Sequence, residues 1–209
     1  MTGTELSANL GLRMEDPAES VFTESAKVDA INMGQKSVVN MIDNNYLAEL
    51  QTVSAAVSVT ANKVSYEDLS ISPIRNGIVG VRATTENLWC TMLEVGDAKR
   101  LENSYLSGST LNPVAYVFKQ IIYAYGPTNI EVWYLKAPTD YAAGALSAEC
   151  ELNPALQELV LDFAEAQLWR MDAKPDRANS AYSNALNVIK VLNERYQIEK
   201  PEGIGTKGR

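Results

Sequence analysis

The sequence predicts an α+β fold in which a helical bundle is interrupted by a β-rich insertion of about five or more strands. Two observations support this. Apolar residues repeat at helical spacing in the first quarter and last third of the chain, and β-branched and aromatic residues crowd the middle. A chain of 209 residues is long enough for one large domain with an insertion. We expect residues 1–51 and 150–198 to form the bundle, 52–149 the insertion and 199–209 a flexible tail.

The N-terminal helical segment is expected from residue 17 to about residue 50, as one long helix or two collinear ones. Asp16 is a suitable N-cap, and Pro17 fits the first helical position. Gly34 should weaken the centre of this helix by about 1 kcal/mol relative to alanine. The apolar residues at helical spacing are Val28, Ile31, Val38, Ile42, Tyr46 and Leu50.

Strands are expected through the middle of the chain. Residues 52–60 are rich in β-branched side chains, and Asn76-Gly77 is a turn signal. The clearest strands are residues 114–125 and 129–136, and the turn residues 126–128 between them predict a hairpin. Because both alternating faces of residues 114–125 are apolar or aromatic, we expect this strand to be covered on both sides.

The last third predicts an antiparallel helical hairpin. Asn153-Pro154 is a cap followed by proline at the first helical position, and Lys174-Pro175 ends one helix and starts the next. We expect the bundle core to contain Ile31, Ile42, Leu159, Phe163, Ile189 and Leu192.

Composition excludes several classes of function. The chain has no histidine, which removes histidine-dependent catalysis and histidine metal ligands. Its net charge of −8 argues against general nucleic-acid binding. Lys119 and Gln120 interrupt the longest apolar stretch, so we expect no membrane span, and the N-terminus does not have the pattern of a signal peptide.

We expect no catalytic residue, no metal and no cofactor. Cys90 lies in an apolar strand and is interpreted as a core residue, whereas Cys150 precedes a helix start that could stabilise a thiolate but has no histidine partner. The carboxylates that cluster are interpreted as solvated helix starts and loops, with a paired-carboxylate hydrolase as the alternative. They are Glu15, Asp16, Glu19, Glu24, Glu149 and Glu151.

Aromatic residues concentrate in one short region. One hypothesis is a platform on which sugars or bases stack, and the other is a sheet core with a subunit interface. The negative net charge favours the second. The residues are Tyr116, Phe118, Tyr123, Tyr125, Trp133, Tyr134 and Tyr141.

Over about residues 17–200 this layout resembles the head–tail connector (adaptor) proteins of tailed bacteriophages, including the tail-tubular-A-like adaptors and portal-proximal ring proteins. The resemblance is carried by residues 25–50 as the first helix, 114–141 as the hairpin and 152–196 as the closing helices. The strand that ends in the step from Tyr134 to Pro138, followed by a loop and a Leu- and Ala-rich helix, is its most specific part.

The resemblance implies a structural virion protein and not an enzyme. It implies a closed ring, dodecameric in this family, between the portal protein and the tail or next neck-ring protein, with genomic DNA passing through without sequence-specific binding. The protein would be made in the host cytoplasm and end in the virion neck. An acidic channel would repel DNA phosphates, which agrees with the net charge. The alternatives are a tail-terminator or baseplate ring, a sugar-binding module and the small hydrolase.

In this family a flexible C-terminal segment often docks into the portal. The tail from about residue 197 has a net charge of +1, opposite in sign to the rest of the chain. Its prolines and glycines should prevent a helix from continuing. The residues expected to dock are Ile198, Lys200, Ile204, Lys207 and Arg209.

Overall fold

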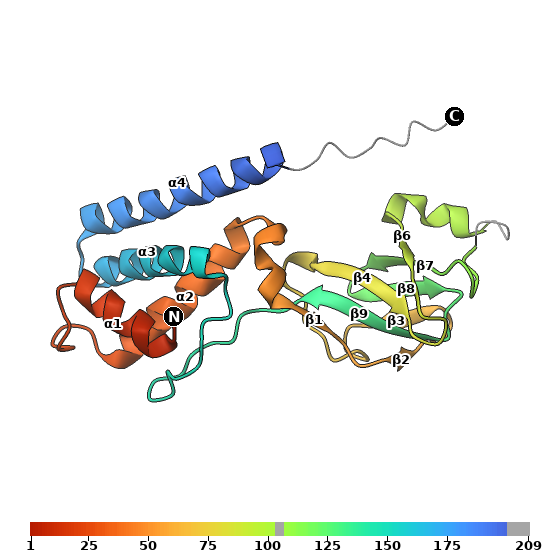
Figure 1. The fold of residues 1–209 in the computed structure, drawn as a ribbon, viewed down its shortest axis with the longest axis horizontal. Coiled ribbons are helices and arrows are strands. Elements are labelled where there is room, and N and C mark those ends of the chain that lie inside the picture. The colour runs from red at the N-terminus through yellow and green to blue at the C-terminus, as the bar shows by residue number, and fades with distance from the viewer. Residues whose placement is uncertain (103–106, 200–209) are drawn as a thin grey trace. The chain divides into compact units, whose positions relative to one another are not determined.

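The computed structural model describes residues 1–102 and 107–199, and these form an α+β fold (Figure 1). N-terminal helices precede a β-rich region of two sheets with nine strands, and a helical hairpin follows. The chain divides into two compact units. The helical unit contains residues Met1–Glu49 and Pro138–Arg209, and the β unit contains Leu50–Ala137. The predicted fold class, a helical bundle with a β-rich insertion, is therefore confirmed.

The helical unit is built from α1 (Gly3–Arg13), α2 (Glu24–Met41), α3 (Pro154–Met171) and α4 (Pro175–Glu199). The central helix α3 packs against both α2 and α4, and α1 packs against α2 and α3. Ile31, Ile42, Leu159, Phe163 and Ile189 are buried as predicted, and Leu192 is half-buried.

Close packing of α2 on α3 depends on Gly34. A Cβ atom at this position would lie 2.5 Å from the carbonyl oxygen of Val160, which is too close for any side chain. Gly34 therefore permits the approach of the two helices, whatever it costs in helix propensity.

The first predicted helix is wrong at its start and at its end. Helix α2 begins at Glu24, with Thr23 as N-cap, and ends at Met41; a 3₁₀ segment η1 (Asn44–Leu50) follows. Asp16 and Pro17 lie in the connection after α1, where Glu15 and Glu19 have positive φ angles that a helix cannot contain. Helix α1 itself was not predicted.

The β unit contains two sheets. One joins β1 (Gln51–Val53), β9 (Asn129–Leu135), β4 (Ile78–Ala83) and β5 (Leu88–Trp89) in that order, and β2 (Val57–Ser58) also pairs with β9. The other joins β3 (Lys63–Ser65), β8 (Ile121–Tyr125), β7 (Val114–Phe118) and β6 (Thr91–Met92). The 3₁₀ segment η2 (Ile74–Asn76) lies between β3 and β4 and so connects the two sheets, whereas η3 (Val95–Glu102) lies between β6 and β7 of one sheet.

A single apolar core lies between these sheets. Val81, Ile130 and Val132 come from the β9-containing sheet, and Ile122 and Ala124 come from the β8-containing sheet. All five are fully buried. Because side chains alternate along a strand, the intervening residues of each strand lie on the outer face of its sheet.

The predicted central hairpin is wrong in its position. Residues 114–125 form two strands, and Lys119 and Gln120, with φ angles of 49° and 62°, make the two-residue turn between them. β8 and β9 belong to different sheets, so the turn at residues 126–128 connects sheets instead of closing a hairpin. The expectation of cover on both sides also fails, because Phe118 remains 42% exposed and the tyrosines beside it are only half-buried.

Candidate functional site

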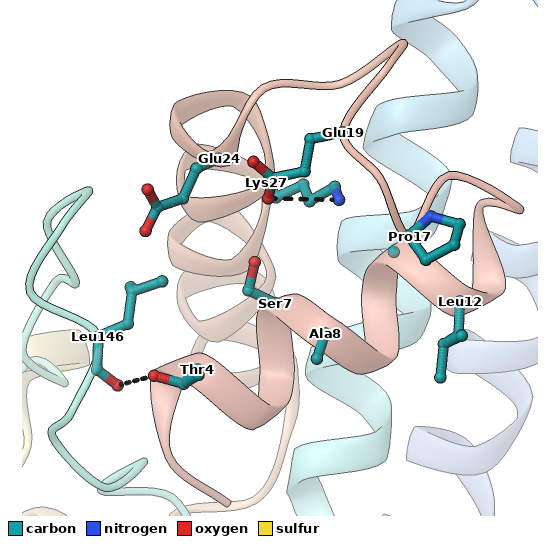
Figure 2. A pocket seen from close by; sticks show the side chains of 10 residues that line it. Thr4, Ser7, Ala8, Leu12, Pro17, Glu19, Glu24, Lys27 and Leu146 are labelled. Atoms are coloured by element: carbon teal, nitrogen blue, oxygen red, sulfur yellow. Dashed lines mark hydrogen bonds and ion pairs between the residues drawn. The ribbon is translucent and has the colours of Figure 1, made fainter.

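A cavity of about 380 Å³ lies in the helical unit between α1, the start of α2 and the segment that joins them (Figure 2). Its wall combines hydroxyl, apolar and charged side chains. The lining residues are Thr4, Ser7, Ala8, Gly11, Leu12, Pro17, Glu19, Glu24, Lys27 and Leu146. Lys27 is the unusual member, because a lysine only 2% exposed has been withdrawn almost completely from water.

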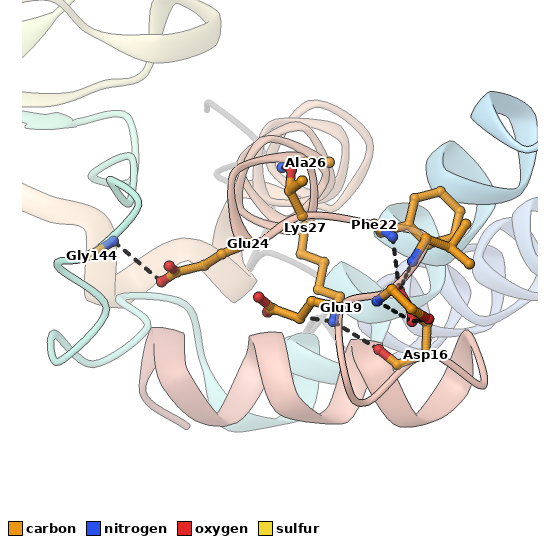
Figure 3. Close-up of polar contacts among 10 residues, drawn as sticks. Asp16, Glu19, Phe22, Glu24, Ala26, Lys27 and Gly144 are labelled. Atoms are coloured by element: carbon orange, nitrogen blue, oxygen red, sulfur yellow. Dashed lines mark hydrogen bonds and ion pairs between the residues drawn. The ribbon is translucent and has the colours of Figure 1, made fainter.

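The ammonium group of Lys27 is held by the connection between α1 and α2 (Figure 3). Its Nζ atom donates to the backbone carbonyl of Asp16 at 3.0 Å and forms an ion pair with Glu19 Oε1 at 3.6 Å. A Cβ atom at Gly11 would lie 3.0 Å from Nζ, so the absence of a side chain there makes room for the lysine. These contacts compensate the buried charge and fix the connection against α2.

The buried side chain of Asp16 holds the same connection between α1 and α2 through hydrogen bonds. Its carboxylate accepts hydrogen bonds from the Ser20 hydroxyl at 2.6 Å, from the Ser20 N–H at 2.7 Å, and from the N–H groups of Val21 and Phe22 at 3.1 and 2.8 Å. The Ser20 hydroxyl, followed by the Phe22 N–H, holds the pKa of Asp16 well below its usual range. Asp16 thus closes a loop and does not cap a helix.

The other clustered carboxylates are spread over the helical unit. Glu24 accepts from the Gly144 N–H at 3.2 Å, which ties the start of α2 to residues 138–153. Glu151 accepts from the N–H and hydroxyl of Thr139 at 2.9 and 3.2 Å. Glu15 and Glu149 are exposed. These contacts stabilise the fold. The interpretation as solvated helix starts and loops fits exposed Glu15 and Glu149 but is wrong for Asp16, whose side chain is buried in the loop that it closes.

A second charged cluster was missed at the sequence level. Arg13 at the end of α1 forms ion pairs with three carboxylates of α3: Glu158, Asp162 at 2.6 Å and Glu165 at 3.5 Å. The Trp169 indole also donates to Glu165 at 3.1 Å. The three acids lie four and three residues apart on one helix, and this spacing was the available signal.

Both cysteines are free and buried. Burial, followed by the charge of Glu86, raises the pKa of Cys90 to about 11. Burial also raises the pKa of Cys150, whose Sγ lies 3.8 Å from Gln35 Oε1. The helix start after Cys150 therefore does not produce a reactive thiolate at neutral pH. Cys90 is the core residue that was expected, although it lies between β5 and β6 and not within a strand.

The aromatic residues form two separate surfaces on the β unit. The first, which we name the tyrosine face, is the outer side of the β8-containing sheet and consists of Lys63, Tyr116, Phe118, Tyr123 and Tyr125. The rings of Tyr116 and Tyr123 stack at 4.6 Å with 1° between their planes, and Tyr125 lies 6.4 Å from Tyr116. Burial and the neighbouring Tyr125 hydroxyl raise the pKa of Tyr116 to about 12.

The second surface, which we name the tryptophan face, is the outer side of the β9-containing sheet and consists of Val53, Gly80, Arg82, Trp89, Glu131 and Trp133. Trp89 and Trp133 meet edge to face at 5.6 Å. Trp89 also covers Gly80, where a Cβ atom would lie 2.8 Å from the indole ring. Sequence analysis named Trp133 but not Trp89.

The remaining two aromatic candidates lie elsewhere. Tyr134 packs against the core between the sheets. Tyr141 is buried in the helical unit, where Asn32 bonds to its backbone on both sides at 2.9 Å. The seven aromatic residues singled out in the sequence therefore do not form one stacking platform.

The predicted docking residues cannot be placed. Ile198 belongs to α4, but its side chain, like Lys200, Ile204, Lys207 and Arg209, lies outside the described residues. Helix α4 extends to Glu199, so the helix continues two residues past the expected start of the tail at residue 197.

No group of three or more His, Cys, Asp or Glu side chains is arranged to hold a metal ion within residues 1–102 and 107–199. Over the same ranges, every helix is too short or too polar to cross a membrane. Comparison with protein-family models and with curated proteins found no match to this chain.

Proposed function

We propose that the protein is a head–tail connector subunit of a tailed bacteriophage, which forms a closed, dodecameric ring between the portal and the tail. The observation that carries this proposal is the order of the two units. A helical unit made from both ends of the chain holds a β unit as an insertion, and this is the layout of the adaptor proteins that the sequence resembles. The partners would be other copies of the chain, the portal and the next ring or tail protein.

The distribution of charge supports a passage for DNA. The helical unit has nineteen acidic and eleven basic residues, whereas the β unit has seven of each. The helical unit therefore carries the whole net charge of −8. A surface of that sign would repel phosphates at distances within the Debye length of about 8 Å, so DNA would pass without being retained.

The geometry gives less support to the other hypotheses. A sugar-binding platform needs open ring faces, but Tyr116 and Tyr123 cover each other. A carboxylate-dependent hydrolase needs a pair of acids free to act, but Asp16 and Glu19 are engaged in the loop around Lys27. A tail-terminator or baseplate ring would have the same chemistry as a connector and differ only in its partners.

The proposal is tested by measuring mass. Native mass spectrometry of the full chain, alone and mixed with the portal ring of the same virus, should give a closed oligomer of 22.9 kDa subunits that binds the portal. A chain that stays monomeric and does not bind the portal would contradict the proposal. A ring that binds only tail or baseplate components would move the assignment to another ring of the tail.

A further inference from the structure

One hydroxyl group in the cavity between α1 and the start of α2 has no partner in the described part of the chain. It belongs to Ser7, which is only 7% exposed and lines the cavity. Its side chain points from α1 toward the start of α2 (Figure 2). Because buried hydroxyl groups are nearly always hydrogen-bonded, the Ser7 hydroxyl requires a partner that enters the cavity.

The other polar groups on the cavity wall are mainly acceptors. The Thr4 hydroxyl donates its proton to the Leu146 carbonyl at 3.2 Å, so its lone pairs remain for a ligand. Glu24 Oε1 accepts from the Gly144 N–H at 3.2 Å, and among the described residues Glu24 makes no other polar contact (Figure 3). A ligand in this cavity must therefore bring donors.

The charge of the wall favours a cation. Lys27, the cation among the described lining residues, is 2% exposed, and its ammonium is engaged by the Asp16 carbonyl and the Glu19 carboxylate. Glu24 forms no ion pair with a described residue. With one cation and two carboxylates, the lining carries a net charge of −1, and the uncompensated charge is that of Glu24.

Apolar side chains complete the wall. They are Ala8, Leu12, Pro17 and Leu146, and a volume of about 380 Å³ leaves room for a short hydrocarbon chain beside them. The matching ligand therefore combines a positive charge, several N–H donors and an apolar stem. A primary ammonium on a methylene chain has all three, because its nitrogen carries the charge and three donors.

We propose that this cavity binds a primary ammonium group at the end of an unbranched methylene chain. Ser7, Thr4 and Glu24 accept its hydrogen bonds, and the methylene stem lies against Leu12 and Leu146. Two sources present this group: a free alkylamine and the side chain of a lysine in a partner protein. The inference does not rest on the connector function, because ring formation does not enter it.

Probes that share a butyl chain test the class of ligand. In ligand-observed NMR with the full-length protein, butylammonium should bind saturably. Butyltrimethylammonium has the same charge without N–H donors and should bind about tenfold more weakly, because charge-assisted hydrogen bonds are lost. Butanol and pentanoate should bind more weakly than butylammonium.

Three results with these probes would overturn the proposal. Pentanoate that binds more tightly than butylammonium would assign the cavity to an anion held by Lys27. Equal binding of the two cations would reduce the contact to general attraction by an acidic protein. If no probe binds saturably, the cavity holds only water, which then satisfies the Ser7 hydroxyl.

Two variants and a matched control locate the bound ammonium. Glu24→Gln retains an acceptor for the Gly144 N–H but removes the charge, so it should weaken butylammonium binding about tenfold. Ser7→Ala should weaken it about threefold. Glu149→Gln makes the same change in net charge at an exposed residue outside the lining and should alter the affinity less than about twofold. Circular dichroism checks folding, and unchanged affinity in Ser7→Ala and Glu24→Gln would overturn the assigned site.

A blocked lysine distinguishes the two sources of the ligand. Nα-acetyl-lysine methylamide presents the ammonium as a lysine within a polypeptide does. If it displaces butylammonium, the result supports a lysine side chain of a partner as the ligand. If butylammonium binds and the blocked lysine does not, the result supports a free alkylamine.

Discussion

The buried ammonium of Lys27 shows how one residue holds together a segment that has no regular structure. Its partners, the Asp16 carbonyl and the Glu19 carboxylate, both belong to the connection between α1 and α2. The Asp16 side chain then fixes the rest of that connection through Ser20, Val21 and Phe22. The cavity beside these residues is therefore bounded by a polar network. Removing a member of this network should lower the free energy of unfolding.

Replacing Lys27 with methionine should lower the free energy of unfolding by about 1–3 kcal/mol, because it leaves a buried carbonyl without its donor. Urea denaturation measures this loss. Lys36→Met is the control: its ion pair with Asp140 is half-exposed on both sides, so its removal should cost less than about 1 kcal/mol. Equal losses for the two variants would show that the contacts of Lys27 contribute nothing beyond a surface pair.

The network also predicts how stability depends on pH. Because folding lowers the pKa of Asp16 below its reference value of 3.8, the ionised carboxylate stabilises the fold above the unfolded pKa. That contribution is lost as the pH falls through the folded pKa. The difference in unfolding free energy between the unchanged chain and Asp16→Asn should be constant from pH 7 to about pH 5 and shrink steadily below about pH 4. A difference that grows on acidification would contradict the assigned role.

At the scale of elements, capping and helix-breaking residues made the starts of the last two helices predictable. The Asn153-Pro154 cap and the Lys174-Pro175 break gave the starts of α3 and α4 as the structure has them. Helix α1 carries a comparable signal, because Thr2 and Glu5 form a capping box, but the apolar pattern of its 11 residues is too short to predict a helix by itself.

Other boundaries could not be obtained from local patterns. The turn at Lys119 and Gln120 has positive φ angles without glycine or asparagine, so its sequence is that of a continuing strand. The composition of the tryptophan face likewise depends on contacts between distant strands, since Val53 of β1 lies opposite Trp133 of β9. The candidate site was harder still, because a lysine in an amphipathic helix gives no sign of being buried.

Substitution of Gly34 tests whether helix propensity or helix packing has the larger effect on stability at this position. Helix propensity alone predicts that Gly34→Ala stabilises the chain by about 1 kcal/mol. The approach of the Val160 carbonyl to 2.5 Å predicts the opposite, a net loss of about 1–3 kcal/mol as α2 and α3 are forced apart. Thermal and urea denaturation of this variant decide the sign, and a stabilised variant would show that the helices separate at no cost.

The C-terminal tail is the element whose role remains a prediction. Removing residues 200–209 deletes Lys200, Ile204, Lys207 and Arg209 but leaves every described residue in place. Portal binding should therefore be lost while the melting temperature stays the same. The readouts are a pull-down on portal rings and differential scanning calorimetry. Unchanged portal binding by the truncated chain would refute docking through the tail.

At the scale of the whole molecule, charge and apolar surface are divided between the two units. The helical unit carries the net charge, whereas the β unit is balanced and carries both aromatic faces. In the proposed ring around DNA these would be complementary tasks, since repulsion would keep the phosphates from being retained and aromatic contact would hold the subunits together. The division gives a direct prediction about which unit assembles.

The ends of the β unit lie side by side, so it can be removed cleanly. β1 pairs with β9, and the Lys136 N–H donates to the Leu50 carbonyl at 3.0 Å. Replacing residues 51–135 with a short glycine-rich linker should leave a folded helical unit. Its cooperative unfolding should be visible in the circular dichroism signal of the helices. Since both aromatic faces are gone, that unit should remain monomeric in sedimentation velocity.

Residues 50–137 expressed alone should retain concentration-dependent association that Trp89→Ser abolishes. If the shortened chain still forms rings, the helices and not the β unit carry the assembly.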